Sequence, residues 1–326
     1  KNSSEVSENT RNLVIKTASK LGYKNATFAT PVIPASETGS NGTILFLTRT
    51  YASDSEFWTT VLRGIESILS NANYHLAISI MSDSDLKQLN FPQTISDSSI
   101  KGIILVEICD KVVCDALSQF NLPIVSVDMP NVPFEELNGI DVVTMESKKN
   151  LKKIINQLIE KGAESFGFVG DLYSPNVSRG FQERYNALSE CLAEHQLPLN
   201  QKNCLLHQTP EDFRNFQTTV NNLQAMISLP DVFICGNDWT AIQLIYALQF
   251  LGFQIPKDIC VVGFDNIPAA SRISPSLTTI STPQKYLGIA AARQILERIQ
   301  HPNCPHVFCQ YETELIIRNS TNIISF

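Results

Sequence analysis

The stretch VFICGNDWTAIQLIYALQFLGFQIPKDICVVG, residues 232–263, decides the fold class. It opens on a short apolar run at 232–235, continues with apolar residues at helical spacing over 240–251, and closes on a second apolar run at 259–263. Short runs rich in Val, Ile and Phe are typical of strands that are buried on both faces. A strand, a helix and a second strand at this spacing predict an α/β fold with a parallel sheet.

The same alternation runs through the chain from about residue 43. Apolar runs separate stretches whose apolar residues recur at helical spacing, as expected for parallel sheets covered by helices on both faces. The further expected strands are 43–48, 75–80, 102–106, 123–128 and 166–170, and the further expected helices are 57–71, 151–161, 184–195 and 213–228.

Three segments interrupt this alternation. Residues 25–41 are rich in Thr, Ser, Pro and Ala and have no apolar period, which indicates a linker. Two further breaks, near 139–146 and 274–283, divide the remaining chain into two sheet systems.

Composition is that of a globular protein. The chain has 326 residues, 43% of them apolar, and a formal net charge of -7. At roughly 150 residues per domain, this length predicts two globular units. We find neither a stretch of about 18 apolar residues nor a leader-like apolar core in the first 30 residues, so we expect a cytoplasmic protein. The eight cysteines are spread thinly and are expected to be reduced thiols.

The charge is unevenly distributed. Residues 1–24 carry a net charge of +3, and the rest of the chain carries -10. Ser7 is a good N-cap, and an apolar stripe behind it ends at Gly22, so this basic head is expected to form one helix that needs partner helices. A basic head can neutralise nucleic-acid phosphates, although a solvated helix face is the alternative interpretation.

Nine positions of residues 6–23 stand at a distinctive spacing: Val6, Ser7, Thr10, Arg11, Val14, Ala18, Leu21, Gly22 and Tyr23. This pattern resembles the third helix of the DNA-binding headpiece in the LacI/GalR family of bacterial transcription regulators. The similarity continues through segments of the body at 57–66, 123–128, 235–238, 252–266 and 314–321.

The resemblance implies a fold and a domain organisation. Residues 1–24 would be the remnant of a helix-turn-helix headpiece, because the two helices that precede this one in the family lie outside the 326 residues. Residues 25–41 would be the hinge linker, and residues 42–326 a body like the two-lobed periplasmic sugar-binding proteins. Three chain crossings would join the lobes, the third near 304–307. The N-lobe would comprise 42–143 and 280–304, and the C-lobe 144–279 and 305–326.

The resemblance also implies function. The chain would be a homodimeric regulator, expected to be a repressor, that binds operator DNA under the control of a sugar or sugar derivative held between the lobes. The residues implied to contact DNA are Thr10, Arg11, Tyr23 and Ala29. The residues implied to bind the effector are Trp58, Asp128, Arg184, Phe213, Asn237 and Asp265.

The chemistry of this set suits a sugar. Aromatic rings stack on the C–H faces of a sugar, and carboxylates, an amide and a guanidinium can bond several hydroxyl groups. Structural interpretations remain beside this one: the aspartates as turn-formers, the aromatic rings as core, and Asn237 as a helix cap. Asp238 is the residue expected to cap that helix.

Other classes of function are less well supported. A solute-binding receptor for a sugar transporter has the same two lobes, and is the main alternative. We find no sequence motif for an enzyme, and no cofactor is expected.

A zinc site is suggested by four closely spaced residues, His301, Cys304, His306 and Cys309. Two prolines among them make tetrahedral ligation difficult, so no metal site is expected.

Overall fold

The computed structural model describes residues 40–49, 55–108, 110–128, 132–172, 179–207 and 215–322. Every described helix and strand belongs to the unit of residues 41–326. The expected headpiece helix and nearly all of the linker, with Thr10, Arg11, Tyr23 and Ala29, lie outside the described residues.

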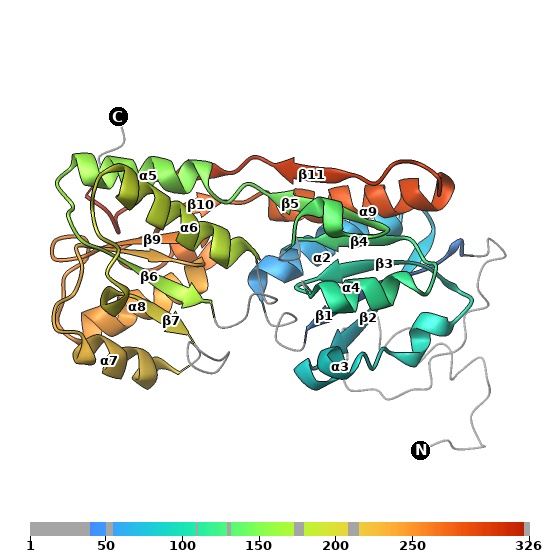
Figure 1. Cartoon of the computed structure of the whole chain (residues 1–326), viewed down its shortest axis with the longest axis horizontal. Helices are drawn as coiled ribbons and strands as arrows, with labels where there is room; N and C mark the ends of the chain where they lie inside the picture. Colours follow the sequence, from blue (N-terminus) through green and yellow to red (C-terminus); the bar gives the residue numbers. More distant parts are fainter. Residues whose placement is uncertain are drawn as a thin grey trace, which may run out of the picture. The chain divides into compact units, whose positions relative to one another are not determined.

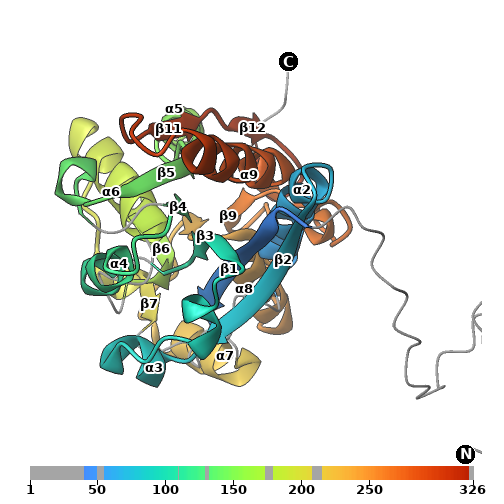
Figure 2. The same cartoon turned by 90° about the vertical axis from the view of Figure 1, so that its right-hand side faces the viewer.

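The first sheet is entirely parallel and has the strand order β11-β5-β4-β3-β1-β2. Helices α2 and α9 pack on one face of it, and α4 packs on the other, as Figure 2 shows. Its strands are β1 (Gly42–Arg49), β2 (Tyr74–Met81), β3 (Ile100–Val106), β4 (Ile124–Val127), β5 (Ile140–Met145) and β11 (Phe308–Tyr311). Its helices are α2 (Glu56–Leu69), α3 (Asp83–Gln88), α4 (Lys111–Ser118) and α9 (Gln284–Gln300).

The second sheet has the order β12-β10-β9-β8-β6-β7, and only its edge strand β12 pairs antiparallel among the strands described. Helices α5 and α6 cover one face, and α7 and α8 cover the other. The strands are β6 (Phe166–Asp171), β7 (Leu205–His207), β8 (Val232–Cys235), β9 (Cys260–Asp265), β10 (Thr278–Ser281) and β12 (Glu314–Ile316). The helices are α5 (Lys149–Glu160), α6 (Arg179–Glu194), α7 (Phe216–Ala225) and α8 (Asp238–Phe250).

Local chemistry explains where several of these helices begin. Ser55 accepts a hydrogen bond from the backbone N–H of Trp58 at the start of α2, and Asp110 and Asn215 act in the same way for α4 and α7. Short 3-10 turns complete the described elements: η2 (Gln93–Ser96), η3 (Phe134–Glu136), η4 (Gln201–Asn203) and η5 (Pro268–Ser271). The α/β class and the parallel sheets expected from the sequence are confirmed.

Helices α2 and α9 pack with their backbones in contact. A Cβ atom added at Gly64 would overlap the carbonyl oxygen of Lys285, and one added at Gly288 would overlap that of Val61. Glycine is needed at both positions because only its hydrogen fits between the two helices. This close packing fixes α2, and with it Trp58, against the first sheet.

Three crossings connect the sheets, between β5 and α5, between β10 and α9, and between β11 and β12 (Figure 1). The expected breaks at 139–146 and 274–283 were wrong in part, because each contains a buried strand, β5 or β10. The third crossing is at residues 312–313 instead of 304–307. The reason is that β11 still pairs with β5 through Tyr311 before the chain passes to β12.

The described cysteines are all free thiols. Four are buried (Cys114, Cys191, Cys235 and Cys260), Cys204 and Cys309 are half-buried, and Cys304 is exposed. Most are therefore apolar core residues, as expected. Within the described ranges, we find no helix that is long and apolar enough to cross a bilayer.

Candidate functional site

Charged side chains gather where the strands of both sheets end. Arg49 ends β1, Glu107 and Asp128 follow β3 and β4, and Asp171 and Asp265 end β6 and β9. In Figure 1 the strands of the two sheets end toward the middle of the unit. Electrostatic interaction of Glu107 with Asp171 shows that the two sets are close to each other. The ends of parallel strands are where open α/β sheets bind ligands.

Arg184 of α6 interacts electrostatically with Asp265 and Asp128 of this cluster. Only 4% of it is exposed, and its Nη1 donates to the carbonyl oxygen of Gly236 at 2.5 Å. The guanidinium carbon lies 3.6 Å from the centroid of the Phe264 ring, a cation–π contact. Its Nε is buried and has no hydrogen-bond partner among the described residues.

Four carboxylates interact electrostatically with this guanidinium, and the two strongest are Asp265 from the second sheet and Asp128 from the first, ahead of Glu183 and Asp238. Burial lowers the pKa of Arg184, and these carboxylates counter this shift in part. Burial likewise raises the pKa of Asp265 well above its ordinary value, although the Arg184 charge opposes the rise. Arg184, Asp265 and Asp128 therefore form one coupled set.

The backbone of Asp265 is fixed by the second crossing. Asp265 has a left-handed φ of 115°, which is uncommon for a residue with a side chain. Its carbonyl oxygen accepts from Gln284 Nε2 at 2.6 Å and from Thr282 Oγ1 at 3.2 Å. The end of β9 in the second sheet is thus tied to the start of α9 on the first.

Asp128 has a comparable backbone. Its φ is 79°, and its N–H donates to the carbonyl oxygen of Val143 at 3.0 Å. The carbonyl oxygen of Asp128 accepts from Ser126 Oγ at 2.7 Å. The side chain is buried, and it interacts electrostatically with Glu107 and Asp265.

The N-cap of α8 is Asn237 and not Asp238. Asn237 caps α8, since its Oδ1 accepts from the N–H of Thr240 at 2.9 Å. Asp238 was expected to be that cap, and the structure corrects this expectation. Asp238 is fully buried and accepts from the N–H of Ile267 at 2.9 Å and from Thr279 Oγ1 at 2.5 Å. It therefore ties η5 and β10 to the start of α8.

Glu107 was not predicted from the sequence, and it joins Trp58 to the cluster. The Trp58 indole Nε1 donates to Glu107 Oε1, and Glu107 Oε2 is buried without a hydrogen-bond partner in the part of the chain described. Burial raises the pKa of Glu107 to about 7; Asp128 and Asp171 add to the rise, and Trp58 and Arg49 oppose it. A polar residue directly after an expected strand was the signal that could have found it.

The structure therefore brings together Asp128, Arg184 and Asp265, with Trp58 linked to them through Glu107. Asn237 opens α8 next to Gly236, whose carbonyl holds Arg184. Phe213 lies outside the described residues. Contact of these side chains with an effector stays a prediction.

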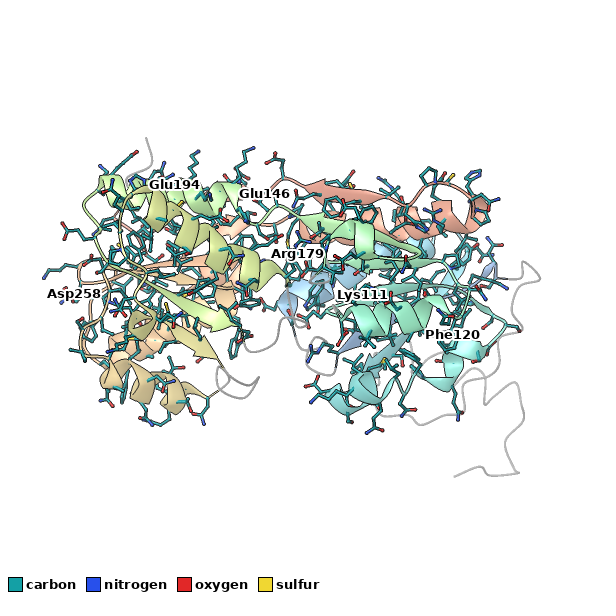
Figure 3. The ribbon with its side chains drawn as sticks, in the orientation of Figure 1. Lys111, Phe120, Glu146, Arg179, Glu194 and Asp258 are labelled. Atoms are coloured by element: carbon teal, nitrogen blue, oxygen red, sulfur yellow. The ribbon has the colours of Figure 1, made fainter. Side chains whose placement is uncertain are left out.

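A hydrogen bond at the start of α6 also links the two sheet systems. Arg179, labelled in Figure 3, donates from Nη1 to the carbonyl oxygen of Val132 at 3.2 Å and pairs through Nε with Glu183 at 2.7 Å. Val132 follows β4 of the first sheet, so this contact holds α6 beside it.

Metal ligation is not seen in the described part of the chain. No three His, Cys, Asp or Glu side chains there lie close enough to hold one ion, and this includes His301, Cys304, His306 and Cys309.

Comparisons with known proteins decide the family. Residues 155–321, half of the chain, match the model of the periplasmic binding protein-like domain. The chain is 26% identical to the ribose operon repressor of Haemophilus influenzae, an alignment that covers 97% of this chain and 90% of that protein. It is 28% identical to catabolite control protein A of Staphylococcus xylosus, over 77% and 75%. The chain belongs to the LacI/GalR family.

Solved structures of transcriptional regulators share the fold. The transcriptional regulator CelR in complex with cellobiose superposes with a TM-score of 0.73 at 18% identity, covering 98% of this chain and 92% of that one. A LacI family transcriptional regulator from Enterococcus faecium with bound ribose gives a TM-score of 0.70 at 22% identity, over 86% and 100%. The resemblance drawn from the sequence is confirmed, and the regulator is favoured over the transporter receptor.

The repressor alignment also reaches the basic head. Because it covers 97% of this chain, it includes most of residues 1–39. These relatives are named as repressors or control proteins and not as enzymes, which is consistent with a LacI/GalR member that is not an enzyme.

Proposed function

We propose that this LacI/GalR member is a DNA-binding repressor whose operator affinity is set by a sugar or sugar derivative bound at the strand ends. One observation carries the proposal: buried Arg184 interacts electrostatically with Asp265 of one sheet and Asp128 of the other, and its Nε is an unused donor. A ligand hydroxyl can accept from that donor and give its own hydrogen to a carboxylate.

The site is suited to signal a change at a distance. A ligand held by Asp128 and Asp265 bridges the two sheets, and Asp265 is tied through Gln284 to α9, which packs on α2. A ligand that binds one arrangement of the sheets better than another shifts the population of that arrangement. The basic head, aligned with the ribose operon repressor, supplies the DNA-binding part of the proposal.

The proposal includes a homodimer formed side by side through both lobes. Apolar side chains are exposed on the edge strand β2, where Ile78 is 53% exposed, and on α8, where Phe250 is 69% exposed. A second copy would cover both surfaces in an isologous interface. Sedimentation should give a dimer at micromolar concentration, and the double variant Ile78→Asp with Phe250→Asp should give a monomer. A monomeric parent protein would contradict this part.

The regulatory role is tested on DNA. A thermal-shift screen of neutral sugars first finds the one that most stabilises the protein, since a ligand at 100 times its dissociation constant adds about 2.7 kcal/mol. Sheared DNA of the source genome is then passed over the protein, and the retained fragments are sequenced.

The enriched fragment is titrated with and without that sugar at one salt concentration. We expect the sugar to change the dissociation constant for DNA about 5-fold to 150-fold, the usual range of allosteric coupling. Failure to enrich any fragment, or equal affinities with and without the sugar, would contradict the role.

A further inference from the structure

At the strand ends, the described side chains include more carboxyl groups than cations. Five carboxyl groups interact electrostatically there, and they belong to Glu107, Asp128, Asp171, Asp238 and Asp265. Among the described residues, Arg184 and Arg49 are cations that interact with these carboxyl groups. Arg49 also forms an ion pair with Asp83, in which Nη2 of Arg49 lies 2.5 Å from Oδ1 of Asp83.

The buried atoms of the cluster include an acceptor and a donor with hydrogen-bonding capacity to spare. They are the acceptor Oε2 of Glu107 and the donor Nε of Arg184, a residue that is only 4% exposed. A buried polar atom without a partner is costly, so such atoms are positions at which a ligand group can bond. The acceptor lies among carboxylates, where a positively charged donor is the best match.

A metal ion does not fit this description. In the described residues, no three acidic, His or Cys groups come close enough to ligate one ion. Carboxylates spread in this way are better reached one by one, by the several N–H groups of an organic cation.

We propose that the effector is a polyhydroxy compound with a protonated amine, and that Glu107 selects it over its neutral analogue. This inference rests on the proposed function, because it concerns the same site. The hydroxyl groups are bound on the Arg184 side, and the ammonium group donates to Glu107, where the charges of Asp128 and Asp171 also favour a cation. Trp58 holds Glu107 in place through its indole N–H.

The electrostatics of Glu107 are consistent with this assignment. Its pKa is raised to about 7 by burial and by the Asp128 and Asp171 charges, against the opposing effects of Trp58 and Arg49. An ammonium ion beside it would favour the ionised carboxylate and lower that pKa. Binding of the amine near pH 7 should therefore release protons from the protein, which binding of a neutral polyol should not.

The test compares two small probes that lack stereochemistry. Tris(hydroxymethyl)aminomethane presents three hydroxymethyl groups and one ammonium group, and pentaerythritol replaces the ammonium with a fourth hydroxymethyl. Thermal-shift titrations in HEPES at pH 7, with sodium chloride to match ionic strength, give an apparent dissociation constant for each. Glucosamine against glucose, and galactosamine against galactose, are a second set of pairs.

The amine should bind at least about tenfold more tightly than its neutral partner, as expected for a charge-assisted hydrogen bond. Glu107→Gln keeps an acceptor for Trp58 and should reduce the preference to less than about threefold. Glu160→Gln, at an exposed glutamate of α5, should keep the full preference. Calorimetry in two buffers of different ionisation enthalpy should detect proton release with the amine probe alone.

Equal binding of amine and neutral probes by the parent protein would overturn the inference, and so would an undiminished preference in Glu107→Gln. The comparison on the parent protein needs no variant to fold. If neutral sugars bind and change DNA affinity while amines have no advantage, the proposed function stands and this inference falls. If amines are preferred but DNA affinity never responds, the inference stands and the regulatory function falls.

Discussion

Two buried arginines differ in how many of their N–H groups are hydrogen-bonded. They are Arg298 of α9, which packs on the first sheet, and Arg184 of α6, which packs on the second. Arg298 is 6% exposed and Arg184 is 4% exposed. Arg298 donates from Nε and Nη2 to the carboxylate of Asp141, at 3.0 and 2.8 Å. It also donates to the carbonyl oxygens of Pro302, Cys304 and Pro305. Within the described residues, Arg184 donates to Gly236 alone and has an unused Nε.

The difference indicates that the Arg298 charge stabilises the fold and that the Arg184 charge is available to a ligand. The hydrogen bonds with Asp141 raise the pKa of Arg298, whereas burial lowers the pKa of Arg184. A buried ion pair with every donor used is a structural element, and here it holds residues 302–307 against β5. A buried cation with an unused N–H donor can still form a hydrogen bond with a ligand.

The largest expected effect is on stability. Arg298→Met should lower the free energy of unfolding by about 3 to 5 kcal/mol, because the buried Asp141 charge loses its partner. Urea denaturation measures this change. Arg293→Met, at an exposed position of the same helix, is the control and should change little. A loss below about 1 kcal/mol for Arg298→Met would contradict the structural role.

The next effect is a pH dependence. The pKa of Glu107 rises from 4.5 to about 7 through burial, so the folded state binds its proton more tightly than the unfolded state does. Stability should therefore fall as pH rises from about 4.5 to 7, by on the order of 2 kcal/mol from this group. Glu107→Gln should flatten the curve of unfolding free energy against pH. A curve of the same slope in the variant would show that Glu107 is ionised throughout.

A smaller effect is expected for Arg184→Met, the same substitution at the incompletely bonded arginine. Its stability should change by less than about 1 kcal/mol, since the charge removed was desolvated and only partly compensated. The measurement is again urea denaturation without ligand. A loss as large as that of Arg298→Met would mean that both arginines serve the fold.

The smallest effect is expected at an exposed ion pair. Lys149 Nζ lies 3.1 Å from Glu312 Oε2 at the third crossing, with both side chains mostly exposed. Lys149→Ala should cost less than about 1 kcal/mol, because such pairs gain little in water. Differential scanning calorimetry at low and high salt checks this, and a larger, salt-independent loss would show that the crossing depends on the pair.

The strands with uniform apolar runs were predictable, and those that depend on distant partners were not. Residues 43–48 and 102–106 form strands because their side chains are buried on both faces. The strand Ile140–Met145 falls in a segment that was expected to be a break, since Asp141 interrupts the apolar run. The charge that makes Asp141 tolerable comes from Arg298, which is 157 residues away.

A similar reason applies to Thr278–Ser281, a polar sequence in a buried strand. The N–H of Thr278 donates to Ser320 Oγ, and its Oγ1 donates to the carbonyl oxygen of Arg318. These partners come from the last part of the chain, and the local sequence does not reveal them.

The candidate site was predictable where a family pattern fixed a position. Arg184, Asp128 and Asp265 do come together, and Arg184 was placed by its resemblance alone. The cap at α8 was misassigned because Asn237 and Asp238 are both good caps, and only the fold supplies the buried partners of Asp238. Glu107 had no family pattern to mark it.

The central claim is that Arg184 and Asp265 bind the effector. The direct measurement is calorimetric titration of the most stabilising sugar into the parent protein, Arg184→Met, Asp265→Asn and the exposed-arginine control Arg272→Met. We expect the first two variants to lose about 10-fold to 150-fold in affinity, the worth of a charge-assisted hydrogen bond, while Arg272→Met keeps the parent affinity. Parent-like affinity in both Arg184→Met and Asp265→Asn would contradict the account.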